Sequence, residues 1–106
     1  MTDRRQKMTP MTSTHEVVDN TAATRFEIRM DGHIAVLVYE LVGRQFRIIH
    51  TIVPEALGGH GLAGTLVQAA IARATAEGLT IIPDCPFARG WLEKHPGVAA
   101  TVSIDW

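Results

Sequence analysis

The most informative stretch of the chain is TIVPEALGGHGLAGTLVQAAIARA, residues Thr51 to Ala74. An apolar segment ends at a proline, four glycines follow within a few residues, and a run of strong helix formers comes next. A glycine inside a helix costs about 1 kcal/mol relative to alanine, so a specific need should outweigh that cost. The stretch predicts a strand, a glycine-rich loop and a helix over residues 61–77. Its glycines are Gly58, Gly59, Gly61 and Gly64.

The segments around this stretch predict one compact mixed domain. Residues 24–30 alternate apolar and charged side chains, and Asp31-Gly32 then signals a tight hairpin turn. Two further apolar strands follow over residues 33–42 and 44–53, the second ending before Pro54. The helix should bury a stripe at three-and-four spacing and end at Gly78 in a left-handed cap. The members of that stripe are Ala63, Leu66, Val67, Ala70, Ile71 and Ala74.

The remaining chain predicts a second half of the fold and a short lead-in. Residues 79–82 form an apolar strand, and a second helix begins with Pro86 at its first position and ends before Pro96. The tail predicts a helical turn and a last strand. Residues 1–20 show no sustained period and are expected to form a flexible lead-in from which Val17 and Val18 can dock, so the domain should span residues 21–106. The expected class is α+β, a mixed and mainly antiparallel sheet with helices packed on it.

Composition excludes several classes of function. The chain has 106 residues and a formal net charge of -1, and its basic residues form no stripe, so no nucleic-acid or membrane partner is expected. No apolar stretch approaches a transmembrane span, and no secretory signal opens the chain. The single cysteine, Cys85, suits a reducing compartment and predicts a cytoplasmic protein. A monomer or weak homodimer is expected.

Three interpretations of the glycines are open. Residues 59–64 fit Gly-x-Gly-x-x-Gly literally, with Asp84 about twenty residues on, as in dinucleotide-binding proteins. That fold needs further βαβ units for which the chain has no room. The second interpretation is a pyrophosphate cradle of another kind, in which backbone N–H groups at a helix start bind an anion. The third is a sharp turn with close helix packing and no ligand.

The cradle interpretation gains support from a resemblance. Gly58-Gly59-His60-Gly61-Leu62-Ala63 resembles the acetyl-CoA loop of the GCN5-related N-acetyltransferases, Gln/Arg-x-x-Gly-x-Gly/Ala, and matches it at Gly61 and Ala63. The likeness covers about residues 24–98 and includes His-Thr-x-Val-Pro, Pro-x-Cys-x-Phe and His-Pro, as in small single-domain acetyltransferase-like proteins. The chain departs at Gly58, where the family has Gln or Arg, and at Ile52, where relatives often carry an acidic residue.

The resemblance implies an acetyl-CoA-dependent N-acetyltransferase acting on a small-molecule or protein amine, with no metal. In the resembled fold a backbone N–H near Ile52 or Val53 polarises the thioester carbonyl. A non-enzymatic acyl-CoA binding or sensing module is the alternative, because the chain is short for this fold. The implied acetyl-CoA contacts are Ile52, Val53, Gly58, Gly59, His60, Gly61, Leu62, Ala63 and Gly64.

Two side chains are candidate catalytic residues. Cys85 precedes Pro86 at a predicted helix start, where the helix dipole favours a thiolate while Asp84 opposes it. In the resembled family this cysteine falls near the CoA thiol, so it is an acyl relay, a proton donor or only a small buried apolar group. His50 is a candidate general base or a hydrogen-bonded histidine of the sheet. Tyr39 could act as an acid, although a core position is favoured.

Overall fold

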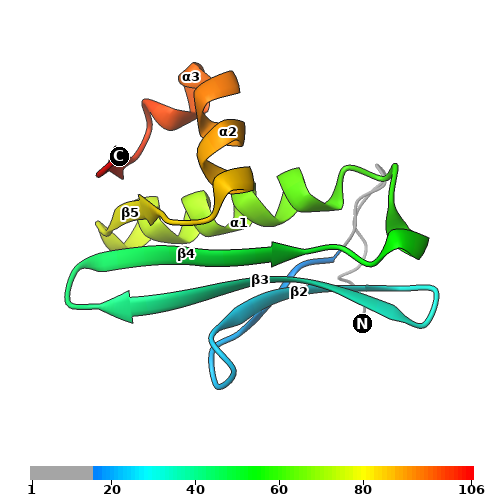
Figure 1. Ribbon diagram of the computed structural model, residues 1–106. Helices are drawn as coiled ribbons and strands as arrows, with labels where there is room; N and C mark the ends of the chain where they lie inside the picture. Colours follow the sequence, from blue (N-terminus) through cyan, green and yellow to red (C-terminus); the bar gives the residue numbers. More distant parts are fainter. Residues whose placement is uncertain (1–15) are drawn as a thin grey trace, which may run out of the picture.

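The computed structural model describes residues 16–106 as six strands and three helices, joined by short loops (Figure 1). The helices are α1 (Leu62–Glu77), α2 (Pro86–Lys94) and α3 (Pro96–Ala99), and a 3-10 turn at Glu55–Leu57 precedes α1. The strands are β1 (Val18–Asn20), β2 (Arg25–Met30), β3 (His33–Val42), β4 (Gln45–Ile52), β5 (Thr80–Pro83) and β6 (Ser103–Ile104).

The strands form one sheet whose spatial order follows the chain order from β1 to β6. Neighbouring strands from β1 to β4 are antiparallel, whereas β4–β5 and β5–β6 are parallel. Helix α1 connects β4 to β5, and α2 with α3 connects β5 to β6. The architecture confirms the predicted α+β class with a mainly antiparallel sheet.

Turn and cap residues in the sequence set most of the boundaries between strands and helices. Asp31 and Gly32 both have positive φ, 52° and 77°, as the hairpin turn between β2 and β3 requires. Gly78 ends α1 in the left-handed conformation, and its N–H donates to the carbonyls of Ala74 and Thr75. The sequence predicts no element before residue 21, but Val18–Asn20 form β1, with Val18 opposite Glu27. Residues 1–15 of the expected lead-in lie outside the described residues.

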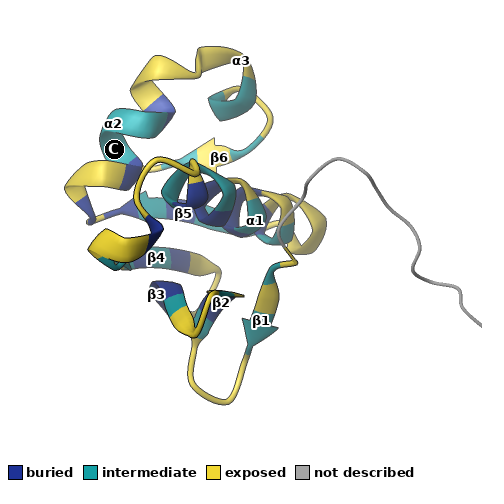
Figure 2. Cartoon of the chain, turned by 90° about the vertical axis from the view of Figure 1, so that its right-hand side faces the viewer, coloured by how far each residue is buried: buried dark blue, intermediate teal, exposed yellow. Residues whose placement is uncertain are grey.

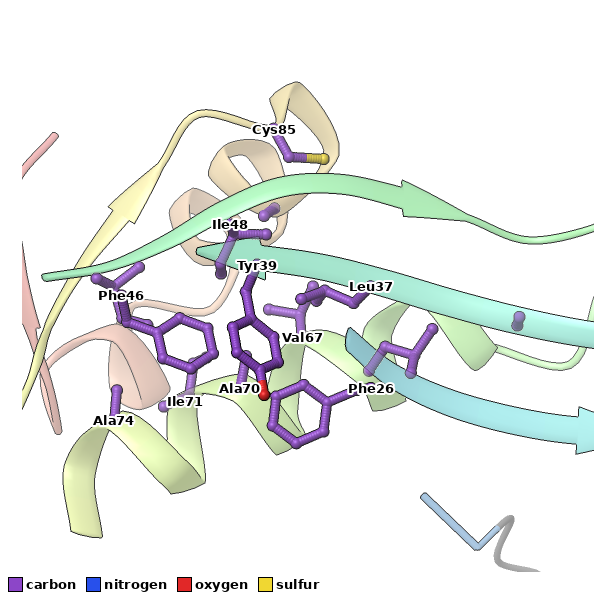
Figure 3. Packing of buried hydrophobic residues seen from close by; sticks show 14 of the residues in the cluster. Phe26, Leu37, Tyr39, Phe46, Ile48, Val67, Ala70, Ile71, Ala74 and Cys85 are labelled. Carbon is purple, nitrogen blue, oxygen red and sulfur yellow. The ribbon is translucent and has the colours of Figure 1, made fainter. Parts of the chain in front are cut away.

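The core lies between α1 and the sheet. Three aromatic rings from neighbouring strands form its centre, with centroid distances of 5.4 Å for Phe26–Tyr39 and 4.7 Å for Tyr39–Phe46 (Figure 3). The predicted stripe of α1 is confirmed except at its start, where Leu62 is buried and Ala63 only half-buried. In Figure 2 the buried residues lie mainly where α1 meets the strands of the sheet.

A partly buried polar network ties β1 to this core. The Tyr39 hydroxyl donates to Asp19 Oδ1 at 2.7 Å, and Arg73 donates from Nη1 to Asp19 Oδ2 at 2.9 Å and to the Tyr39 oxygen at 2.7 Å. Arg73 also pairs with Glu77 at 3.0 Å. Tyr39 is therefore a core residue with a satisfied hydroxyl, which favours the core interpretation over a catalytic acid.

This network should control the titration of Tyr39, the one tyrosine of the chain. Burial raises the pKa of Tyr39 from its ordinary 10.0 to about 12, and Asp19 adds to the rise while Arg73 opposes it. Because the folded pKa is raised, the protonated hydroxyl stabilises the fold fully below pH 10. That contribution is lost as the pH rises through about 12.

Absorbance titration of the phenolate should give a midpoint near 12 for the native protein and near 10 in urea. Asp19→Asn should lower the native midpoint, because it removes the negative charge beside the hydroxyl. Asp31→Asn, in the exposed hairpin turn, is the matched control and should leave the midpoint unchanged. A native midpoint equal to the one in urea would contradict this account of the network.

Candidate functional site

The sheet splits between β4 and β5. Strand β5 pairs only with the first four residues of β4, and the last pair is Ile48 with Pro83. The chain then turns into α2, where the Cys85 N–H donates to the Ile48 carbonyl at 2.9 Å. In the described register, residues 49–52 therefore have no partner on the β5 side. An unpaired strand edge offers backbone N–H and C=O groups to a ligand.

A β-bulge marks the same point. Tyr39 lies opposite Ile48, but its neighbour Val38 lies opposite His50, so Ile49 is the extra residue of β4. An extra residue reverses which side chains face the helices, and bulges are common beside active sites. After the bulge, Thr51 lies opposite the buried Leu37 and so faces α1.

The glycine-rich loop brings the start of α1 to this end of β4. Gly59 and Gly61 have φ of 85° and 68°, and Gly61 stands at the N-cap position of α1. A Cβ at either glycine would meet no atom within 4 Å. The first turn of α1 contains no acidic residue, and no side chain of residues 16–106 caps it. Its N–H groups are therefore available to an anion, which fits the phosphates of a CoA ester.

The other two glycines of the loop serve different needs. Gly58 has an extended backbone, φ −64° and ψ 153°, and a Cβ there would lie 3.3 Å from the Glu55 carbonyl oxygen. A Cβ at Gly64 would lie 2.8 Å from Trp91 Nε1. Gly64 is thus glycine because α2 packs against it, so close helix packing explains one of the four glycines.

Cys85 lies beside the split. It caps α2, is 5% exposed, and its Sγ contacts Thr51 Oγ1 at 3.5 Å. Figure 3 shows the sulfur across β4 from Tyr39. The neighbouring Asp84 is held by Arg47, with contacts of 2.7 and 3.1 Å to Asp84 Oδ2. The carboxylate that follows β5 is thus paired with a guanidinium.

The structure does not bring His50 and Cys85 together. His50 is exposed and pairs with Val38 on the face of the sheet opposite to α1, whereas Cys85 contacts Thr51 on the helix side. Ile52 shares the face of His50 and is 54% exposed. Val53 is half-buried and packs against the core.

The sequence pattern did not identify two of the residues at this site. Thr51 has no signal of its own, because the bulge that turns it toward Cys85 lies inside an apolar strand. The residues around Trp91 in the sequence do not indicate its contact either, and only the structure places its indole against Gly64. Both contacts join segments that are far apart in the chain.

Three further observations concern the described part of the chain. Among residues 16–106, no group of three or more His, Cys, Asp and Glu side chains is arranged to hold a metal ion. No helix in the same range is long and apolar enough to cross a membrane. Three strand pairs of the described sheet are antiparallel, and the strands lie side by side in the order of the chain. The doubly wound sheet of dinucleotide-binding proteins is mostly parallel, and its strand order reverses near the middle.

Known proteins show the same fold and related sequences. The family model of the GCN5-related N-acetyltransferases matches residues 25–101. Protein NATD1 of mouse is 33% identical over 75 residues, which cover 68% of this chain and 68% of the mouse protein. Human NATD1 is also 33% identical over 75 residues and covers 68% of this chain.

A solved structure agrees with these sequence relatives. A GCN5-like protein of Staphylococcus aureus, whose solution structure was determined by NMR, matches with a TM-score of 0.67 and 28% identity. The match covers 90% of this chain and 94% of that protein. The chain therefore belongs to the GCN5-related N-acetyltransferase family.

Proposed function

We propose that this protein binds acetyl-CoA at the split between β4 and β5 and transfers the acetyl group to an amine. One observation carries the proposal: the first turn of α1, which has no side-chain cap among the described residues, lies at the same end of the sheet as the last residues of β4, which have no partner on the β5 side (Figure 1). In sheets with parallel βαβ units, ligands bind at the carboxyl ends of the strands, where helices begin. The single cysteine further supports a place in the reducing cytosol.

The backbone would hold most of the ligand. The N–H groups from Gly59 to Gly64, with those of His60, Leu62 and Ala63 between them, would receive the pyrophosphate, and the positive end of the α1 dipole would favour its charge. Bound acetyl-CoA supplies an activated thioester. A backbone N–H near Ile52 or Val53, beyond the last partner from β5, would polarise the carbonyl oxygen.

The side chains of Cys85 and His50 would have more limited roles than the backbone. Cys85 is buried beside the split with a hydroxyl as its hydrogen-bond partner, so it would contact the CoA end of the ligand and return a proton to the leaving thiolate. His50 faces the open side of the sheet, so it would act as a base only for an acceptor approaching from that side.

An acyl-CoA binding or sensing module is the second candidate. Gly58 stands where the resembled loop carries Gln or Arg, which removes one phosphate contact. Within residues 16–106, the hydrogen-bond partner of Cys85 Sγ is Thr51 and not a base. Both facts allow binding without efficient transfer.

Release of CoA thiol in the presence of a panel of amines and peptides separates the two functions. Transfer predicts amine-dependent release under multiple-turnover conditions, and Cys85→Ala should slow it by about 10²-fold if Cys85 is the general acid. Mass spectrometry after mixing with acetyl-CoA alone should show no acetyl adduct on wild-type protein. Binding of acetyl-CoA without release for any acceptor would favour the sensing module, and a Cys85-dependent adduct that amines discharge would establish an acyl relay.

A further inference from the structure

Trp91 of α2 lies against the first turn of α1. A Cβ on Gly64 would approach Trp91 Nε1 to 2.8 Å, a distance that real Cβ contacts do not reach. The indole thus occupies the place of a side chain on α1. Gly64 is the third residue of that helix, so its N–H is one of the unpaired donors of the first turn. The polar edge of the indole therefore lies next to the uncapped helix start.

The indole is fixed in this position from the other side. The His95 ring stacks on it with a centroid distance of 3.8 Å and an interplanar angle of 13°. His95 Nδ1 also donates to the Trp91 carbonyl oxygen at 2.7 Å. The hydrogen bond to the backbone orients the His95 ring, and the stacked ring in turn restricts the rotamer of Trp91.

Within the part of the chain that the structure describes, no atom accepts a hydrogen bond from the indole N–H of Trp91. The hydrogen bonds of residues 16–106 include one to the Trp91 carbonyl and none from Trp91 Nε1. An indole N–H that is partly buried usually has a hydrogen-bond partner. The indole N–H therefore adds one more donor to the backbone N–H groups of the first turn of α1. One anionic or carbonyl oxygen could accept hydrogen bonds from several of these donors.

We propose that Trp91 is a binding residue of the acyl-CoA site. Its indole N–H donates to an oxygen of the bound acyl-CoA at the start of α1, and Gly64 lacks a side chain so that the indole can reach that position. This inference rests on the proposed function, because it adds a contact to the same site. It also gives α2 a second role there, besides presenting Cys85.

Intrinsic fluorescence tests the contact directly, without any measurement of activity. The chain has two tryptophans, and Trp106→Phe leaves Trp91 as the only indole. Trp106 is 51% exposed and lies over Arg89, so its loss should leave affinity unchanged. Titration of this variant with acetyl-CoA should change the Trp91 emission with a midpoint equal to the calorimetric Kd.

Two substitutions test the hydrogen bond and the packing of the indole against Gly64. Trp91→Phe keeps an aromatic ring between Gly64 and His95 but removes the N–H, and should weaken acetyl-CoA binding about tenfold. Gly64→Ala should weaken binding to a similar extent, because its Cβ displaces the indole. Gly90→Ala is the matched control: it lies in α2 beside Trp91, and a Cβ there meets no atom within 4 Å.

The outcomes distinguish this inference from the proposed function. If acetyl-CoA binds wild-type protein, but Trp91→Phe binds equally well and the Trp91 emission does not change, only the inference is wrong. If acetyl-CoA does not bind wild-type protein at all, both are wrong. A tenfold loss in Trp91→Phe and Gly64→Ala, with normal binding by Gly90→Ala, supports the role of the indole.

Discussion

Replacing Gly61 by asparagine should weaken acetyl-CoA binding by about a hundredfold while the protein stays folded. Gly61 stands at the N-cap position of α1 with φ of 68°, and the space where its Cβ would project is open. Asparagine tolerates this left-handed conformation better than other residues with a side chain, so the cost in folding should stay near 1 kcal/mol. Its side chain would fill the space beside the first-turn N–H groups, where a pyrophosphate must lie. Calorimetric titration measures the change in Kd.

Gly43→Asn supplies the control for this experiment. Gly43 also has a left-handed backbone, φ 59°, and a Cβ there meets no atom within 4 Å, but it lies in the turn between β3 and β4. Its substitution should cost the same stability and leave affinity unchanged. Equal affinities for the two variants would show that the loop serves only to turn the chain. Valine at position 61 is a poorer probe, because β-branched residues are strained at positive φ.

Phe46→Ala should have the largest effect on stability. Phe46 is fully buried, and its ring centroid lies 4.7 Å from that of Tyr39 and 6.3 Å from that of Phe26. Removal of a buried phenylalanine ring typically costs about 3–5 kcal/mol, because the cavity does not collapse. For a domain of this size the melting temperature should then fall by more than about 10 °C. Urea unfolding followed by circular dichroism measures the loss.

Phe87→Ala makes the same substitution at an exposed site. Phe87 is 44% exposed in the first turn of α2, so its loss should change the free energy of unfolding by less than about 1 kcal/mol. A similar loss for Phe46 and Phe87 would contradict the placement of the aromatic core. The comparison also separates stability from binding, since neither ring is a proposed ligand contact.

The elements that the sequence predicted are those encoded locally. The alternation in β2, the Asp31-Gly32 turn, the Pro54 stop and the Gly78 cap each depend on residues within a few positions of one another. The mixed sheet follows from their order along the chain. The strand at Val18–Asn20 was missed because its stability depends on distant partners, namely Glu27, Tyr39 and Arg73.

The candidate site was only partly predictable for the same reason. Gly59 and Gly61 belong to a local motif, and the structure gives both the left-handed backbone that favours glycine. The need for Gly64 could not be read from its neighbours, because Trp91 reaches it from another helix. The opposite faces of His50 and Thr51 follow from one extra residue in β4, which the apolar pattern of the strand does not indicate.

Calorimetric titration of the wild-type protein with acetyl-CoA, and separately with NAD, shows whether the start of α1 is an acetyl-CoA site, which is the claim at stake. The uncapped start of α1 and the split sheet predict saturable binding of acetyl-CoA at one site and no comparable binding of NAD. At a hundred times Kd, acetyl-CoA should also raise the free energy of unfolding by about 2.7 kcal/mol. Tighter binding of NAD than of acetyl-CoA, or no binding of acetyl-CoA, would contradict the claim.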